Sequence, residues 1–227
     1  MIEAADEDAL LIRFGDAIDS ALPAQIADLC QRIEALELPW LVDLVPSYTT
    51  LLVIYDPITI NVLDAKSRLR PLLAETQSAD RIKSETTESR LIELPIYYSE
   101  ETGPDLAWIA EQKGLSVQQV IDRHTADTYQ VYAIGFAPGF GFMGQVDPTI
   151  ACPRKDTPRT KVPAGSVGIA NQQTAVYPKT SPGGWQLIGR CPTVLFDEDN
   201  LSLLKAGDRV RFVSISREEY LAQGGQL

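Results

Sequence analysis

The sequence of 227 residues predicts two folded parts, a small α+β domain over residues 1–78 and a mainly-β domain over residues 91–227, joined by a linker over residues 79–90. Strand and helix patterns alternate at first, whereas beyond residue 129 short apolar runs are separated by Gly, Pro and Asn. Between the two parts, residues 76–90 carry almost no apolar side chain, and such a segment cannot bury enough surface to fold. A long solvated loop inside one domain is the alternative.

The first part is predicted to hold one sheet covered by two helices. Residues 9–16 form an apolar run typical of a strand, and residues 20–36 form an amphipathic helix whose apolar side chains recur on one face. A pair of strands is expected over residues 40–57. Residues 61–75 then show a second helical pattern, which Pro71 is expected to kink or shorten.

The second part begins with a predicted strand over residues 91–98, followed by two short helices. Pro104 suits the first turn of a helix, and Gly114 suits its end. Ser116 and Gln119 have the spacing of a capping box at the start of the next helix. After this helix pair, the many short strands and turns predict a barrel or a sandwich.

The net charge of −11 is unevenly distributed along the chain. Residues 1–139 carry the acidic excess, whereas residues 140–227 hold slightly more Lys and Arg than Asp and Glu. Such a chain repels nucleic acid over most of its surface, because neutralised phosphates supply most non-specific affinity. The helix pair has a helix–turn–helix outline, but its second helix offers few basic side chains. We therefore expect no nucleic-acid partner, and a small anion as the ligand of the later part.

Composition also limits the cellular compartment and the kinds of metal site that can be expected. No window approaches the roughly 18 apolar residues of a membrane span, and the N-terminus is acidic where a signal peptide would be basic. We therefore expect a cytoplasmic protein without a membrane partner. The three cysteines are far apart and His124 is the only histidine, so neither a disulfide framework nor a metal site is predicted.

Residues 132–147 combine three phenylalanines with four glycines and one proline. Glycine lets the backbone approach a ligand closely, and proline restricts the direction of that approach. This stretch is therefore a candidate binding loop. The alternative is a tight hairpin whose phenylalanines simply belong to the core.

Four basic residues follow within ten positions, and two of them belong to Pro-Arg pairs that favour extended backbone. They are Arg154, Lys155, Arg159 and Lys161. An arginine fork suits a carboxylate or a phosphate, and the prolines lower the entropy lost in holding it in place. The alternative is a solvated basic strand that binds nothing in particular.

Residues 162–190 place five glycines among amide and hydroxyl side chains that could orient a small polar ligand. The segment contains no phosphate-binding GxxxxGK[ST] motif. Ser166 lacks the GxSxG spacing of a nucleophile elbow, so a dyad of Ser166 with His124 is disfavoured. His124 lies at the predicted end of the second short helix, which favours its protonated form. It is either a general acid or base or a core histidine.

Three of these segments carry a resemblance to a known family: GFAPGFGFMG, CPRKDTPRTKVPAGSVGIANQQTAVYP and SPGGWQLIGR. The chain resembles the KipI family, also called allophanate hydrolase subunit 1, most densely between His124 and Asp197. The resemblance implies a small α+β domain followed by a cyclophilin-like β-barrel. It also implies a KipA-like partner that completes a composite site, and a third, LamB/YcsF-like protein.

The activity implied by the resemblance is the hydrolysis of 5-oxoproline to glutamate, with ATP and its Mg²⁺ as co-substrate, by the complex rather than by this chain alone. His124, Arg154 and Arg159 are then the candidate catalytic residues, since a proton must move and an anion must be held. The candidate substrate-binding residues are Pro138, Gly139, Phe140, Gly165, Ser166, Gln173, Tyr177, Gly183, Gly184 and Trp185.

The chain departs from the family pattern at a few positions. Relatives usually carry Tyr where this chain has Phe142, and a Gly where it has Asn171 or Ala175. Thr128 and Cys191 also differ from the residues common in relatives. Two alternatives therefore remain: a KipI-like inhibitor of a sensor histidine kinase, or a carboxyltransferase-like component of a urea- or amide-metabolising enzyme.

Overall fold

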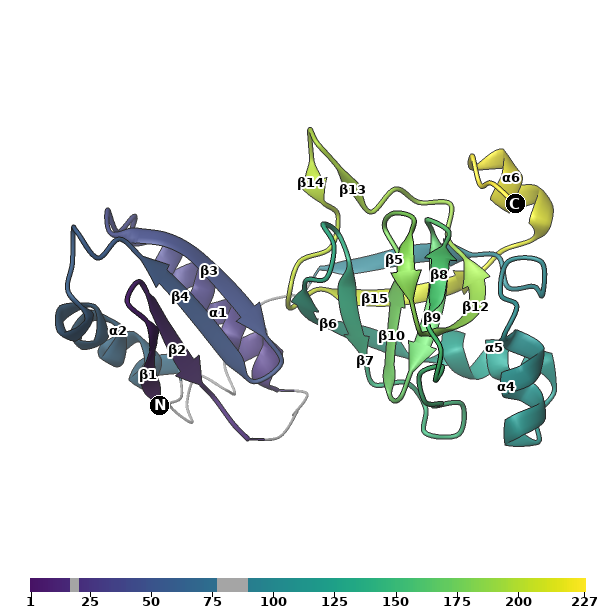
Figure 1. Cartoon of the computed structure of the whole chain (residues 1–227), viewed down its shortest axis with the longest axis horizontal. Coiled ribbons are helices and arrows are strands. Elements are labelled where there is room, and N and C mark those ends of the chain that lie inside the picture. Colours follow the sequence, from purple (N-terminus) through teal and green to yellow (C-terminus); the bar gives the residue numbers. More distant parts are fainter. Residues whose placement is uncertain (17–20, 77–89) are drawn as a thin grey trace. The chain divides into compact units, whose positions relative to one another are not determined.

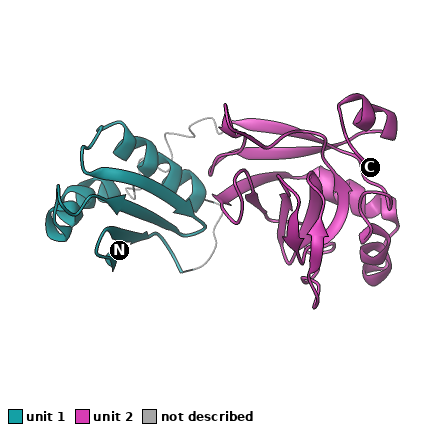
Figure 2. Cartoon of the chain, turned by 45° about the horizontal axis from the view of Figure 1, so that its top comes forward, with its two compact units in different colours: residues 1–89 teal, residues 90–227 magenta. Residues whose placement is uncertain are grey.

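The computed structural model describes residues 1–16, 21–76 and 90–227 (Figure 1). The chain divides into two compact units, Met1–Ser89 and Arg90–Leu227, which are coloured separately in Figure 2. The predicted linker over residues 79–90 lies outside the described residues, apart from Arg90.

The first unit contains a four-stranded antiparallel sheet in the order β1-β2-β4-β3. Two helices accompany the sheet, and their apolar side chains pack with those of the strands in one core. These elements are β1 (Ile2–Asp6), β2 (Ala9–Arg13), α1 (Leu22–Glu34), β3 (Leu41–Ser47), β4 (Thr50–Tyr55) and α2 (Val62–Thr76).

Pro71 does not shorten α2, which continues past it to Thr76. The proline is exposed, so the carbonyl that loses its hydrogen bond to the missing N–H can be hydrated instead. Arg32 of α1 supports the end of the helix, donating hydrogen bonds to the carbonyl oxygen of Leu72 at 2.9 Å and to Oγ1 of Thr76 at 2.7 Å. A contact between the two helices therefore offsets the helix-breaking tendency of the proline.

The second unit is built on a seven-stranded sheet in the order β12-β9-β10-β7-β6-β15-β5. All neighbouring strands are antiparallel except β15 and β5, which are parallel. These strands are β5 (Leu91–Ile96), β6 (Thr128–Ile134), β7 (Gly141–Gly144), β9 (Ser166–Ala170), β10 (Gln173–Val176), β12 (Gln186–Arg190) and β15 (Arg209–Ser214).

The two ends of this sheet meet, so the sheet closes almost completely into a barrel. Tyr97, just after β5, exchanges both backbone hydrogen bonds with Arg190 at the end of β12, at 2.9 and 3.0 Å. Two short pairs of strands stand beside the barrel: β8 (Arg159–Val162) with β11 (Ser181–Gly183), and β13 (Phe196–Asp197) with β14 (Leu201–Ser202). The structure is mostly β, as predicted.

Two helices, α4 (Leu106–Lys113) and α5 (Val117–Ala126), lie against one side of the barrel (Figure 1). Gly114 ends α4 in a left-handed conformation with φ of 64°, and Ser116 and Gln119 form both hydrogen bonds of the predicted capping box. The apolar faces of both helices are buried in the main core of this unit. The last helix is α6 (Arg217–Ala222).

Candidate functional site

A cavity of about 300 Å³ opens in the second unit, at the small end of the range for small-molecule sites. Its aromatic wall consists of Phe136, Phe140, Phe142, Tyr177 and Trp185. The remaining lining residues are Arg154, Lys155, Pro158, Gly183 and Gly184. The aromatic and the basic segments that the sequence singled out therefore meet in one place.

Phe140 is the centre of the aromatic wall. Its ring centroid lies 4.8 Å from that of Phe142, 5.2 Å from that of Tyr177 and 5.7 Å from that of Trp185, all in edge-to-face arrangements. Such pairs contribute about 0.5–1.5 kcal/mol each beyond their buried area. Because Phe140 is buried among these rings, the wall is rigid and offers ring faces and edges to a flat ligand.

The loop between β6 and β7 places these rings. Gly139 has a φ of 81°, and a Cβ there would lie 2.8 Å from the carbonyl oxygen of Leu195, so only glycine fits. Pro138 is exposed in the same turn. Phe136 also has a positive φ, 69°, and its side chain is 65% exposed. The stretch is thus both a hairpin with core phenylalanines and a wall of the cavity.

Arg154 and Lys155 supply the positive charge of the cavity. The guanidinium carbon of Arg154 lies 5.9 Å from the ring centroid of Trp185, a cation–π contact, and the side chain is exposed. The backbone N–H of Lys155 donates to the carbonyl oxygen of Gly184 at 2.7 Å, which ties the basic segment to the PGGW segment. A negatively charged ligand is therefore favoured.

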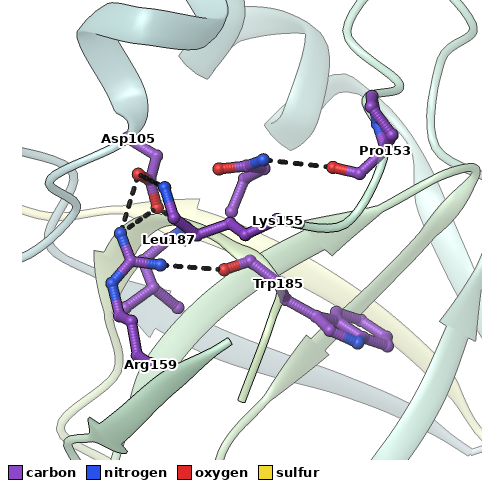
Figure 3. Close-up of polar contacts among 7 residues, drawn as sticks. Asp105, Pro153, Lys155, Arg159, Trp185 and Leu187 are labelled. Carbon is purple, nitrogen blue, oxygen red and sulfur yellow. Dashed lines mark hydrogen bonds and ion pairs between the residues drawn. The ribbon is translucent and has the colours of Figure 1, made fainter. Parts of the chain in front are cut away.

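Behind this wall, Asp105 holds two of the predicted cations (Figure 3). One guanidinium nitrogen of Arg159 donates to both of its carboxylate oxygens at 2.7 Å, and Nζ of Lys155 donates to Oδ1 at 3.1 Å. The backbone N–H of Leu187 donates to Oδ2 at 2.7 Å. Arg159 uses its other terminal nitrogen to reach the carbonyl oxygen of Trp185 at 3.3 Å.

The carboxylate of Asp105 is buried, yet it remains ionised. Burial alone would raise its pKa, but hydrogen bonds from Arg159, from the N–H of Leu187 and from Lys155 outweigh burial and hold the pKa below its usual value. Asp105 is the N-cap residue of α4, but its side chain makes no capping hydrogen bond there. Its carboxylate instead ties the start of α4 to β8 and β12.

Tyr177 and Gly183 fit closely at the edge of the cavity. A Cβ on Gly183 would lie 2.4 Å from the hydroxyl of Tyr177, so this position has no room for a side chain. Burial raises the pKa of Tyr177. A hydrogen bond with the backbone of Trp185 and the charges of Arg154 and Arg159 lower the pKa, but by less than burial raises it. The hydroxyl therefore stays protonated and can act as a neutral polar group.

His124 does not lie at the cavity but in the core between α5 and the barrel. Its Nδ1 shares a hydrogen bond with the hydroxyl of Tyr98 at 2.7 Å, and its Nε2 shares one with Oγ1 of Thr174 at 2.9 Å. Its ring also stacks on Phe212, with the centroids 4.7 Å apart. Burial lowers the pKa of His124 to about 3. The expectation that its place at a helix end favours the protonated form is therefore wrong, because desolvation outweighs the helix end.

Pro138, Gly139 and Arg159 stand beside the cavity without lining it, and three predicted residues of the later segment do not line it either. Gly165 has a φ of 78° and forms a turn in which a Cβ would lie 2.3 Å from the carbonyl oxygen of Cys191. Ser166 is fully buried, and its Oγ has no hydrogen-bond partner among the described residues. Gln173 lies in β10, between β7 and β9. Residues 165–173 therefore form part of the barrel rather than of the cavity wall.

The described ranges hold neither a metal-ligand cluster nor a membrane helix. Within residues 1–16, 21–76 and 90–227, no group of three or more His, Cys, Asp or Glu side chains could hold a metal ion. No helix in the same ranges is long and apolar enough to cross a membrane.

Sequence reasoning missed Asp105, the residue that organises the cations. Its place directly after Pro104 indicated only the start of a helix. Two Pro-Arg pairs are consistent with a distant carboxylate that pairs with them, but nothing in the sequence identifies which of the many acidic residues supplies it.

Comparisons with known proteins agree along most of the chain. A family model described as carboxyltransferase domain, subdomain C and D, matches residues 1–204. The B subunit of 5-oxoprolinase from Bacillus subtilis (strain 168) is 40% identical, over 97% of this chain and 95% of that protein. The corresponding B subunit from Escherichia coli O157:H7 is 39% identical, over 91% and 92%. The solved structure of TTHA0988 is 33% identical with a TM-score of 0.80 over 95% of this chain, which spans 40% of the length of that chain.

Proposed function

Because this chain belongs to the family of carboxyltransferase domains, subdomains C and D, and matches 5-oxoprolinase B subunits over nearly their full length, we propose that it is the B subunit of an ATP-dependent 5-oxoprolinase. The complex would hydrolyse 5-oxo-L-proline to L-glutamate. The observation that carries the proposal is the 40% identity, which extends over 97% of this chain and 95% of its relative.

The chemistry of this substrate suits the cavity. 5-Oxoproline is a five-membered cyclic amide that bears one carboxylate, and its ring can lie against the faces and edges around Phe140. Its carboxylate can meet the cations at the rim, Arg154 and Lys155. A cavity of about 300 Å³ suits a molecule of this size better than a whole nucleotide.

The reaction itself needs activation, because an amide in a five-membered ring resists attack by water. Transfer of the terminal phosphoryl group of ATP to the amide oxygen releases ADP and makes the ring carbon more reactive. One water then opens the ring at the carbon–nitrogen bond, and a second releases phosphate and glutamate. The developing negative charges need cations and hydrogen-bond donors in fixed positions. Arg154 and Lys155 can hold the substrate for such a step.

We propose that the other two proteins of the complex are a KipA-like protein and a LamB/YcsF-like protein, that ATP with its Mg²⁺ is the co-substrate, and that the assembly is cytoplasmic. The naming of the relatives as B subunits supports a complex of several subunits. The length of TTHA0988 supports a fixed partner as well, since the equivalent of this chain is 40% of one longer polypeptide there. This chain alone would be inactive.

The finer description of the fold belongs to the same proposal. We propose that residues 1–78 and 91–227 are separate domains and that the second has a cyclophilin-like barrel. The closure of its sheet between Tyr97 and Arg190 supports a barrel.

The test is reconstitution from three purified proteins: this chain, a KipA-like protein and a LamB/YcsF-like protein from the same genome. Glutamate release from 5-oxo-L-proline is followed with and without ATP, and mixtures that omit one protein at a time serve as controls. The proposal expects ATP-dependent release from the complete mixture alone. An inactive complete mixture, or equal release without this chain, would refute it.

A further inference from the structure

The two arginines of the Pro-Arg pairs differ in their electrostatic surroundings. The side chain of Arg159 is 23% exposed and faces Asp105, whose side chain is 7% exposed. Arg154 is exposed and lies over the ring of Trp185. Both residues directly follow a proline, so only the structure separates their roles.

Asp105 leaves Arg159 little capacity for a further anion. A carboxylate has about four acceptor positions, and Asp105 receives two contacts from Arg159, one from Lys155 and one from the N–H of Leu187. The terminal nitrogens of Arg159 are directed to Asp105 and to the carbonyl oxygen of Trp185. A ligand that took the place of Asp105 at this guanidinium would have to break a buried ion pair, which costs far more than an exposed one.

Arg154 is in the opposite situation. Among the residues that the structure describes, it forms no ion pair, and its contact is with the face of Trp185. A guanidinium that lies over an indole ring still has N–H groups free to bind both oxygens of a carboxylate. The contact with the ring also limits the side-chain entropy lost on binding.

We propose that Arg154 is the specificity-determining residue that binds the carboxylate of the small cyclic substrate, and that Arg159 is a positioning residue that Asp105 reserves for the wall of the cavity. The inference rests on the proposed function for the identity of the substrate. It goes further because only one of the two arginines, Arg154, binds the carboxylate. Ligands without a carboxylate should therefore bind poorly.

The experiment measures ligand binding to the full chain, without partners or ATP. With Trp40→Phe and Trp108→Phe, Trp185 becomes the single tryptophan and reports from the cavity itself. The probes are 5-oxo-L-proline and 2-pyrrolidinone, which has the same ring and amide but no carboxylate. A charge-assisted hydrogen-bonded pair predicts a preference for 5-oxo-L-proline of about tenfold to a hundredfold.

Four variants in this background separate the roles. Arg154→Gln should abolish the preference, so that both probes bind alike, because the other lining cation, Lys155, is already paired with Asp105. Arg154→Lys should restore part of the preference, because charge returns without the planar fork. The neutral pair Asp105→Asn with Arg159→Gln should keep the preference. Lys161→Gln, which removes an exposed charge of β8 that does not line the cavity, is the matched control and should also keep it.

Three results would overturn the inference: a preference that survives Arg154→Gln, a preference that is lost in the Asp105→Asn, Arg159→Gln pair, or no binding of 5-oxo-L-proline to the Trp185-only chain. Each is distinct from failure of the proposed function, which is judged by glutamate release from the three-protein mixture. Binding that follows the expected pattern without any turnover would leave Arg154 as a carboxylate receptor and refute the oxoprolinase role.

Discussion

Acid should destabilise the second unit through His124 alone by a measurable amount. The imidazole is fully buried between Tyr98 and Thr174, and burial lowers its pKa from 6.5 to about 3. The unfolded chain therefore takes up a proton near pH 6.5, whereas the folded chain does not. A base whose folded pKa is depressed contributes its full stability above the unfolded pKa and loses it as the pH falls toward the folded pKa.

The size of the loss follows from the two pKa values. At about pH 5 the unfolded imidazole is almost completely protonated and the buried one almost completely neutral, so linkage costs about 2 kcal/mol relative to about pH 7.5. The variant His124→Gln keeps an amide near both hydrogen-bond partners but does not titrate. It should be less stable than the wild type at neutral pH, and this difference should shrink by about 2 kcal/mol on acidification.

Urea denaturation followed by tryptophan fluorescence measures this difference. In a Trp40→Phe background the signal comes from Trp108 and Trp185, which both belong to the second unit. Carboxylates that titrate over the same pH range are common to both proteins and cancel in the comparison. If the wild type and His124→Gln lose equal stability between the two pH values, the imidazole is not held neutral in the core, and the reasoning is refuted.

Three substitutions test single contacts of the barrel and the cavity. Gly165→Ala should lower the free energy of unfolding by about 2–5 kcal/mol, because a Cβ at positive φ meets the carbonyl oxygen of Cys191; unchanged urea denaturation would contradict this. Gly183→Ala should displace the ring of Tyr177 and weaken 5-oxo-L-proline binding in a fluorescence titration, and an unaltered affinity would be inconsistent with the contact. Phe140→Ala should cost about 3–5 kcal/mol by calorimetry or urea denaturation, whereas a loss below about 1 kcal/mol would show that the wall is not close-packed.

Local elements were predictable because their signals are local. The amphipathic pattern over residues 20–36 and the capping box at Ser116 describe α1 and the start of α5 closely. By contrast, β1 was missed, because four of its five residues are exposed and so show no apolar alternation. The closure of the barrel was not predictable either, since the hydrogen bonds between Tyr97 and Arg190 join residues far apart in sequence.

The structure brings some of the predicted site residues together at one cavity, whereas the electrostatics of that cavity were not predicted. Phenylalanines, Pro-Arg pairs and the PGGW segment meet at one cavity, as their chemistry suggested. The role of Asp105 depends on contacts with residues about 50 positions later in the chain, and the neutral state of His124 depends on burial by other elements. The position of His124 near a helix end predicted the wrong protonation state. The effect of a helix end can be inferred from neighbouring residues in the sequence, whereas desolvation depends on burial by distant elements of the fold.

The lining of the cavity itself argues for a second protein in the reaction. Ring opening of a cyclic amide requires that water lose a proton and that the departing nitrogen gain one. The described residues around the cavity include no carboxylate, imidazole or thiol. Their two remaining candidates for proton transfer offer no free base, because the ammonium of Lys155 pairs with Asp105 and the hydroxyl of Tyr177 stays protonated. Asp105 is saturated with donors and His124 is sealed in the core, so neither can exchange protons with a ligand there. On the proposed function, this chain therefore binds and orients the substrate, and the base that activates water belongs to a partner.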